Sequence, residues 1–189
     1  MGELGATVVQ SLQAQITDPD SGIEAILPKV SASLAAMYDQ WFPFEKFQVQ
    51  PLNPEEAVRP EIGCILAGYP TAGRKNTGSA DIYSLVSPLN FAPLLHNYGF
   101  ALSGVAQYGL YLMNRIYQPD IALGDAIALA HYVITETASQ DGKVGGKVRI
   151  ATIDPQRGYA ELPGEELKSL DERDRQVNQA LARLFRSPR

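Results

Sequence analysis

Apolar residues recur at intervals of three and four along much of the chain. This spacing predicts helices over residues 2–16, 21–38, 105–117, 123–139 and 164–185. Ser21 with Glu24 three residues later predicts a capping box at the start of the second helix, and Pro28 predicts a kink or the true start. The predicted buried face of the helix over 123–139 consists of Leu123, Ala126, Ile127, Ala130, Val133, Ile134 and Thr137.

Short apolar runs bounded by glycine and proline predict the strands. These runs are residues 62–67, 82–86, 94–95, 100–102, 148–153 and 159–162. Pro155 and Gly158 lie between the last two runs and predict a hairpin turn. Strands that follow pairs of helices predict an α+β fold, in which antiparallel strands form a sandwich with helices on the outside.

Composition excludes several classes of partner. A formal net charge of -5 and a pI near 5.0 argue against a nucleic-acid-binding surface, which is normally basic. No apolar run approaches the length of a membrane span, which is about 18 residues, and the first residues lack the features of a secretory signal. The single cysteine, Cys64, lies in an apolar run. We therefore predict a cytoplasmic protein in which Cys64 is a buried structural thiol.

The sequence motifs give little support for a phosphate-binding loop, a metal site or a catalytic triad. The stretch 142–148 resembles a phosphate-binding loop, but Val148 stands where such a loop needs Ser or Thr. His96 and His131 lie far apart in sequence, so we predict a core or surface role for each and no metal site. Ser103, His131 and Asp141 could be imagined as a triad, but no nucleophile elbow is present. We predict no cofactor.

Two segments leave alternatives open. Residues 41–60 are rich in proline and aromatic side chains, which either cover an edge of the core or form a partner-binding patch. The helix over 164–185 has charges of mixed sign and an apolar side formed by Leu167, Leu170, Val177, Leu181 and Leu184. It packs either on its own domain or on a neighbouring subunit.

An ordered set of segments carries a resemblance. Its clearest member is Asp141, followed by Gly145, Gly146 and the strand over 148–153. The others are residues 2–5 with the helix that follows them, 65–69, 100–104, 113–117 and 126–130. Together they resemble the proteasome-type (20S proteasome subunit-like) family of N-terminal-nucleophile hydrolases, over nearly everything from residue 2 to about 162.

The resemblance implies a four-layer αββα sandwich and subunits that assemble into stacked rings around a proteolytic chamber. In that family an N-terminal threonine is the nucleophile, and its free amine takes the hydroxyl proton. A lysine and an aspartate of the opening strands support the nucleophile. A serine near the third helix, an aspartate after the fourth helix and a serine three residues later complete the site.

The chain departs from this pattern at several positions. Asp141 matches the family aspartate, but Val144 stands at the later serine, and valine donates no hydrogen bond. Gly104 stands at the first serine, and Ser103 is adjacent to it. The resemblance therefore implies Asp141 and, more weakly, Ser103 as catalytic residues. The opening strands, the lysine and the nucleophile are absent, because the chain begins at the family's first helix.

Two explanations account for this absence. We favour a fragment of a longer subunit, because the first helix matches up to Met1; the other is a member that keeps the fold for assembly only. We accordingly predict an N-terminally incomplete proteasome-like domain over 1–163 and a charged C-terminal helix over 164–189. The implied function is a subunit of a ring-forming threonine protease in intracellular protein degradation, and the alternative is a non-catalytic structural subunit. The implied partners are other proteasome-like subunits, in a homo- or hetero-oligomeric ring, and a peptide substrate.

Overall fold

The computed structural model describes residues 10, 22–47, 59–70, 80–154 and 157–185. The chain divides into two compact units, residues 1–103 and 104–189, and each is described by itself. The helix expected over 2–16 and most of the segment 41–60 lie outside the described residues. Within the described part, no helix is long and apolar enough to cross a membrane.

Helix α2 (Ile23–Trp41) supplies the core of the first unit. One stripe is buried at a spacing of three and four residues, as the sequence predicts, and its members are Ile23, Leu27, Val30, Leu34 and Tyr38. The helix begins at Ile23 with Gly22 as its N-cap, and glycine has no side chain with which to cap it. The predicted capping box involves Ser21, which lies outside the described residues. Pro28 lies inside the helix and does not start it.

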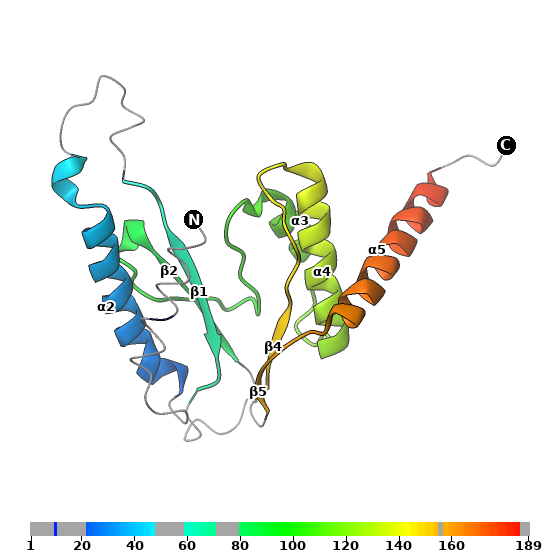
Figure 1. Cartoon of the computed structure of the whole chain (residues 1–189). Coiled ribbons are helices and arrows are strands. Elements are labelled where there is room, and N and C mark those ends of the chain that lie inside the picture. Colours follow the sequence, from blue (N-terminus) through cyan, green and yellow to red (C-terminus); the bar gives the residue numbers. More distant parts are fainter. Residues whose placement is uncertain (1–9, 11–21, 48–58, 71–79, 155–156, 186–189) are drawn as a thin grey trace. The chain divides into compact units, whose positions relative to one another are not determined.

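A three-stranded antiparallel sheet in the order β1-β2-β3 lies against α2 (Figure 1). Its strands are β1 (Gly63–Gly68), β2 (Asp81–Val86) and β3 (Leu94–Leu95). Cys64 pairs with Leu85 across β1 and β2, and both pack against the α2 stripe. Ile65 pairs with Ser84 on the opposite face, where Ile65 is 37% exposed. The alternation of the strands thus gives the sheet one covered face and one open face.

The helix and the sheet approach each other closely at the end of β1. The backbone N–H of Ile23 donates to the carbonyl of Tyr69 at 3.0 Å. A Cβ placed on Gly68 would lie 3.3 Å from the Cβ of Ile23. Glycine at this position therefore lets α2 start directly above the strand.

The segment after β2 turns sharply and returns a large side chain to the core. Asn90 and Phe91 both have positive φ angles, 50° and 56°, and Phe91 is only 1% exposed. Its ring meets that of Tyr38 edge-on, with the ring centroids 5.5 Å apart. The strand expected over 100–102 is wrong, since these residues are not in a strand and follow a turn in which Gly99 has a φ of 77°.

Aromatic side chains close one end of the first unit. Phe42 packs against the core, and its ring centroid lies 5.4 Å from that of Tyr38 and 6.3 Å from that of Phe47. The guanidinium of Arg59 lies 4.1 Å above the Tyr38 ring. Phe44, in a short 3-10 helix (Phe44–Lys46), is 57% exposed. For Phe42, the expected role at the core edge is confirmed.

The second unit contains α3 (Ala106–Ile116), α4 (Leu123–Gln140) and α5 (Gly164–Leu184), close to the predicted ranges. The predicted buried face of α4 is only partly correct. Val133 and Thr137 are buried, but Leu123 and Ile134 are 67% and 40% exposed. The rest of the buried set is Ala128, Leu129 and His131. The buried face is rotated relative to the predicted one, because α4 packs on both α3 and α5. A polar residue, His131, takes part in the contact with α5.

Strands β4 (Ala151–Asp154) and β5 (Gly158–Glu161) form the expected antiparallel hairpin. β4 begins three residues later than predicted. Gly158 opens β5 with a φ of 74°, a conformation that favours glycine. From β5 the chain runs through Pro163 into α5, and the predicted domain boundary at residue 163 stays a prediction.

Candidate functional site

Asp141 stands at the C-terminal end of α4 and organises the turn that follows. Its backbone N–H donates to the carbonyl of Thr137 at 3.0 Å. Its carboxylate oxygen Oδ1 accepts from the N–H of Lys143 at 2.8 Å, and its carbonyl accepts from the N–H of Val144 at 2.9 Å. Such a side chain bonded to the backbone two residues ahead stabilises a turn. The role that the resemblance implies for Asp141 stays a prediction.

Ser103 is exposed and ends the first unit, whereas Asp141 belongs to the second. The hydroxyl oxygen of Ser103 lies near Gly63, at the start of β1. A Cβ placed on Gly63 would be 3.7 Å from this oxygen. Gly104, which matches the family serine, has a φ of 88°, so a serine there would be strained. The proposed participation of Ser103 with Asp141 in one site therefore also stays a prediction.

Sequence reasoning did not pair Ser84 with His96. The hydroxyl oxygen of Ser84 lies 2.6 Å from Nε2 of His96, and the N–H of His96 donates to the carbonyl of Ile82 at 2.8 Å. A serine beside a histidine is the first element of a nucleophilic site, but acyl transfer also requires an oriented base and donors for the oxyanion. We assign this contact the structural role of joining β2 to the segment after β3.

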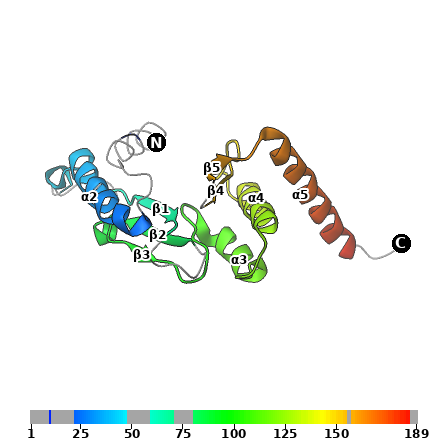
Figure 2. The same ribbon diagram turned by 90° about the horizontal axis from the view of Figure 1, so that it is seen from below.

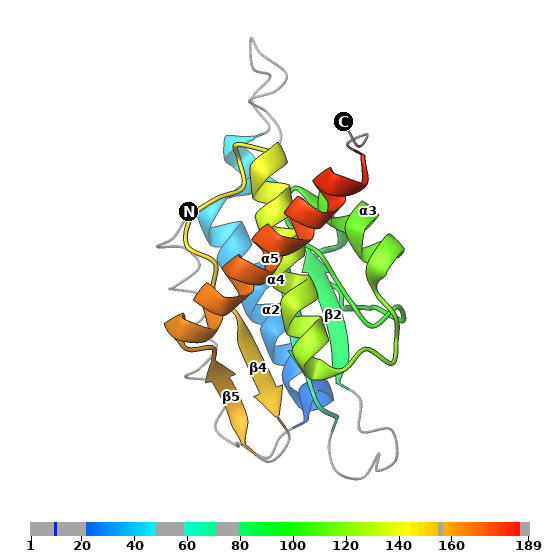
Figure 3. The same ribbon diagram turned by 90° about the vertical axis from the view of Figure 1, so that its right-hand side faces the viewer.

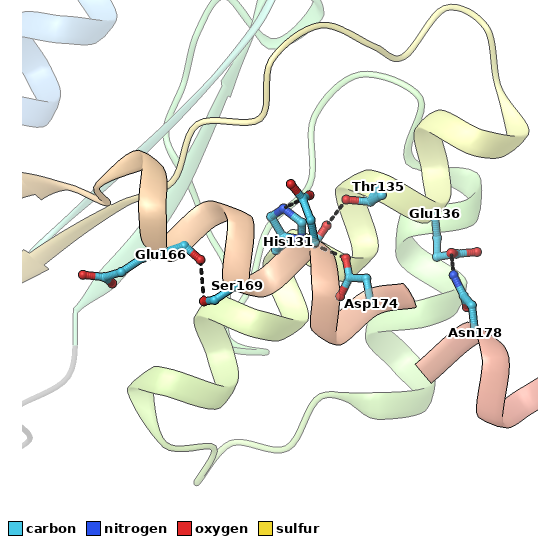
Figure 4. A network of polar contacts seen from close by, with 8 residues as sticks. His131, Thr135, Glu136, Glu166, Ser169, Asp174 and Asn178 are labelled. Carbon is cyan, nitrogen blue, oxygen red and sulfur yellow. Dashed lines mark hydrogen bonds and ion pairs between the residues drawn. The ribbon is translucent and has the colours of Figure 1, made fainter. Parts of the chain in front are cut away.

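The second unit holds a buried histidine between two carboxylates (Figure 4). His131 of α4 is 1% exposed. Its Nδ1 lies 2.8 Å from Oδ2 of Asp174, and its Nε2 lies 3.3 Å from Oδ1 of Asp171, both on α5. Asp174 is itself buried, and Asp171 is exposed. The imidazole is thus held at both nitrogens and acts as a link between two helices.

Neighbouring polar pairs extend this link along α4. The amide of Asn178 donates to Glu136 at 2.6 Å, and Arg173 reaches Asp125 at 3.4 Å. A cleft of about 590 Å³ adjoins the histidine, and its polar lining includes Lys147, Glu165, Lys168 and Asp171. His131 also lines this cleft, but only 1% of its surface is exposed, because the carboxylates of α5 cover the imidazole. Of the core or surface role predicted for His131, the structure shows the core role.

One sequence signal could have revealed the buried pair. Asp174 occupies a place in the apolar stripe of α5, between Leu170 and Val177. A charged residue at a core-facing position needs a buried partner, because an unpaired buried charge is costly. The partner lies 43 residues away in sequence, so the spacing alone does not identify it.

The thiol of Cys64 faces the core of the first unit. Burial raises the pKa of Cys64, which disfavours the reactive thiolate. This agrees with the structural role expected for it, although the residue is half-buried and not fully buried as predicted. Among the described residues, no three His, Cys, Asp or Glu side chains are grouped so that they could hold a metal ion.

Comparison with known proteins gives a result for the fold alone. No protein-family profile and no curated protein matches the chain. The structure is similar to "Anbu (ancestral beta-subunit)" from Yersinia bercovieri, with a TM-score of 0.66 and 12% identity over 98% of this chain and 76% of that one. It is also similar to an Anbu (Gly-1) mutant from Hyphomicrobium sp. strain MC1, with a TM-score of 0.60 and 15% identity over 96% of this chain and 75% of that one.

These similarities correct the family inferred from the sequence. The expected 20S proteasome subunit-like membership is wrong, because the similar structures are named as Anbu proteins and no family profile matches the chain. The segments behind the resemblance are paired helices, a glycine turn and short strands, and such features specify a fold more than a family. The chain has an α+β fold similar to that of the Anbu proteins.

Proposed function

We propose that this chain is a structural subunit of an oligomeric, Anbu-like assembly, and that its helices form the contacts between subunits. The observation that carries the proposal is the apolar surface of the second unit. Large apolar side chains are exposed on three helices, and they include Leu110, Tyr111, Leu123, Leu181 and Leu184. Large apolar side chains that are exposed in one chain become buried when such chains associate, which favours association. One of the similar structures, from Yersinia bercovieri, is named as a beta-subunit, which agrees with this role.

The four-layer αββα arrangement is part of the same proposal. In the first unit α2 covers one face of the sheet, and Ile65 and Leu94 are exposed from its other face. In the second unit the hairpin carries exposed Ile153 and Tyr159. Sheets with apolar open faces are stabilised by packing on a second sheet. A cytoplasmic location also belongs to the proposal, and the single cysteine supports it.

The assembly is tested by measuring the mass of the full chain in solution by light scattering after gel filtration. We expect particles of at least twice the 20.6 kDa of one chain, with a mass that falls on dilution. A single species of 20.6 kDa at every concentration up to about 100 μM would contradict the proposal, since working assemblies have affinities in or below that range.

Peptide hydrolysis by an N-terminal-nucleophile mechanism is the second candidate function, and Asp141 favours it. Among the described residues only its Oδ1 is engaged, by the N–H of Lys143, so Oδ2 is available to support an amine. Fluorogenic peptides test this function. If the native assembly cleaves them, Asp141→Asn should lower kcat by about a hundredfold while Asp120→Asn, in an exposed loop, leaves it unchanged. Ser103→Ala tests the weaker candidate. If the assembly does not hydrolyse the peptides, the second candidate function is rejected and only the structural role remains.

A further inference from the structure

The apolar stripe of α5 is longer than the part of it that α4 covers. Its positions alternate at intervals of three and four residues, the spacing of a helix that pairs with another helix, and they are Leu167, Leu170, Asp174, Val177, Leu181 and Leu184. Leu167 and Leu170 are half-buried and Asp174 is buried. Val177, Leu181 and Leu184 are 39%, 44% and 77% exposed. The stripe thus has a covered first half and a bare second half.

The covered half of the stripe ends where the contacts between α4 and α5 end. The polar links to α4 begin at Asp171 and extend to Asn178. Beyond that residue α5 diverges from α4, as Figures 1 and 2 show, and residues 179–185 are all exposed. Figure 3 shows α5 crossing over α4 at an angle, which explains why one helix covers only part of the other.

An apolar groove lies beside the start of the bare stripe. Its volume is about 260 Å³, and α5 contributes Arg173, Asp174 and Val177 to it. The rest of the lining, from α3, α4 and the loop between them, is mostly apolar and includes Ile116, Ile121, Ala128, Leu129 and Tyr132. The groove can therefore receive a large apolar side chain that approaches along α5.

The charges of α5 favour a second copy of the same helix as the occupant. Residues 164–175 contain Glu165, Glu166, Asp171, Glu172 and Asp174, against three basic residues. From residue 176 to the end the only charged residues are arginines, the first of them Arg183. An antiparallel pair brings the basic end of each helix toward the acidic half of the other, whereas a parallel pair brings both basic ends together.

We propose that the C-terminal half of α5 pairs antiparallel with the same helix of a second copy, around a two-fold axis. In this register Val177 of each copy lies opposite Leu181 of the other. The register places Leu184 and Phe185, which is 86% exposed, beside the apolar groove of the other copy. Such a contact is self-complementary, as a two-fold interface requires. The inference rests on the proposed assembly and names one of its contacts.

The first test changes the stripe in the full chain. The double variant Leu181→Glu, Leu184→Glu should weaken the association by at least about tenfold, because a buried unpaired carboxylate is unfavourable. Leu89→Glu, at a 48% exposed position of the first unit, is the matched control and should leave the mass unchanged. Circular dichroism should show an unchanged fold, since both replaced leucines are exposed.

The outcomes of this test separate the two proposals. A wild-type chain that is monomeric overturns both. A wild-type oligomer that keeps its mass and affinity in the double variant overturns the α5 contact and leaves the assembly in place. If the control also dissociates, the loss is not specific to α5 and the inference fails. Binding of α5 by an unrelated protein, with no self-association, also overturns it.

Cross-linking tests the direction of the pair. In a Cys64→Ser background, Val177→Cys mixed with Leu181→Cys should form the mixed disulfide, because the register brings these positions together. Leu184→Cys alone should not cross-link, since two such residues would lie about 15 Å apart along antiparallel helices, beyond the reach of a disulfide. Rapid cross-linking of Leu184→Cys with itself would indicate a parallel pair and overturn the proposed geometry.

Discussion

At the scale of single residues, His131 shows how a polar side chain becomes part of a helix–helix contact. Its two nitrogens face carboxylates of α5, and one of these, Asp174, is nearly as buried as the imidazole itself. In a low-dielectric setting a satisfied hydrogen bond is strong, and an unsatisfied group is correspondingly costly. The pair therefore makes the docking of α5 sensitive to a single substitution.

Replacing Asp174 by Asn tests this link. We expect a loss of about 1–3 kcal/mol in the free energy of unfolding, because the buried imidazole loses its charged partner. The matched control is Asp171→Asn at the exposed carboxylate, for which we expect a change within about 0.5 kcal/mol. Urea denaturation measures both. Equal effects of the two variants would show that Asp174 is no more important than a surface contact.

Glu161 provides a test by pH. The hydrogen bond from Tyr159, at 2.8 Å, together with the pairing with Arg149, lowers the pKa of Glu161 below its ordinary value of 4.5. A carboxyl whose pKa is lower in the folded state stabilises that state above its ordinary pKa. This contribution is lost as the pH falls through the lowered pKa.

Carbon NMR of the Glu161 carboxyl measures the effect directly. We expect a titration midpoint below 4.5 in the native chain and a higher midpoint in Tyr159→Phe, which removes the largest cause of the shift. The chain kept unfolded in concentrated urea over the same pH range serves as the reference. An identical midpoint in the native chain and in Tyr159→Phe would show that the hydroxyl does not stabilise the carboxylate.

At the scale of elements, the first unit depends on the contact between α2 and one face of the sheet. Leu85 of β2 is 0% exposed and lies under the α2 stripe, whereas Leu95 of β3, on the same sheet, is 49% exposed. Ser31 of α2 also donates to the carbonyl of Phe91 at 2.9 Å, so the helix holds the turn that follows β2. The contact of Leu85 with α2 and the hydrogen bond of Ser31 to Phe91 both depend on the position of β2, which carries Leu85 and precedes the turn with Phe91.

Leu85→Ala should lower the free energy of unfolding by about 2–5 kcal/mol, because it leaves a cavity in a packed core. Leu95→Ala should change it by no more than about 0.5 kcal/mol. Thermal denaturation followed by circular dichroism compares the two variants. A loss for Leu95→Ala as large as that for Leu85→Ala would mean that the exposed edge of the sheet is covered in solution.

At the scale of the whole molecule, several helices of the chain carry large apolar side chains that are exposed. α5 is the extreme case, since Asp174 is its only buried residue within the described part of the chain. A helix of this kind gains most of its stability from packing, so association would stabilise it as well as join subunits. Assembly and the stability of the C-terminal helix should therefore be coupled.

The sequence by itself determined the elements. The helices over 105–117 and 123–139 and the hairpin after residue 150 follow from local periodicity and turn residues, which act within a few positions of the chain. The same reasoning failed at 100–102 and on the face of α4, where contacts distant in sequence decide the outcome. It also identified a family where only a related fold is shown, because features that specify elements are common to several families.

Only the tertiary structure decided which side chains meet. The partner of His131 lies 43 residues away, and Ser84 meets His96 across a sheet whose register no local pattern specifies. Whether α5 packs on its own domain was open in the sequence, and the structure answers it for the first half of the helix. The reason is physical: a periodic stripe indicates that a face will be buried, but the partner is set by chain geometry over long distances.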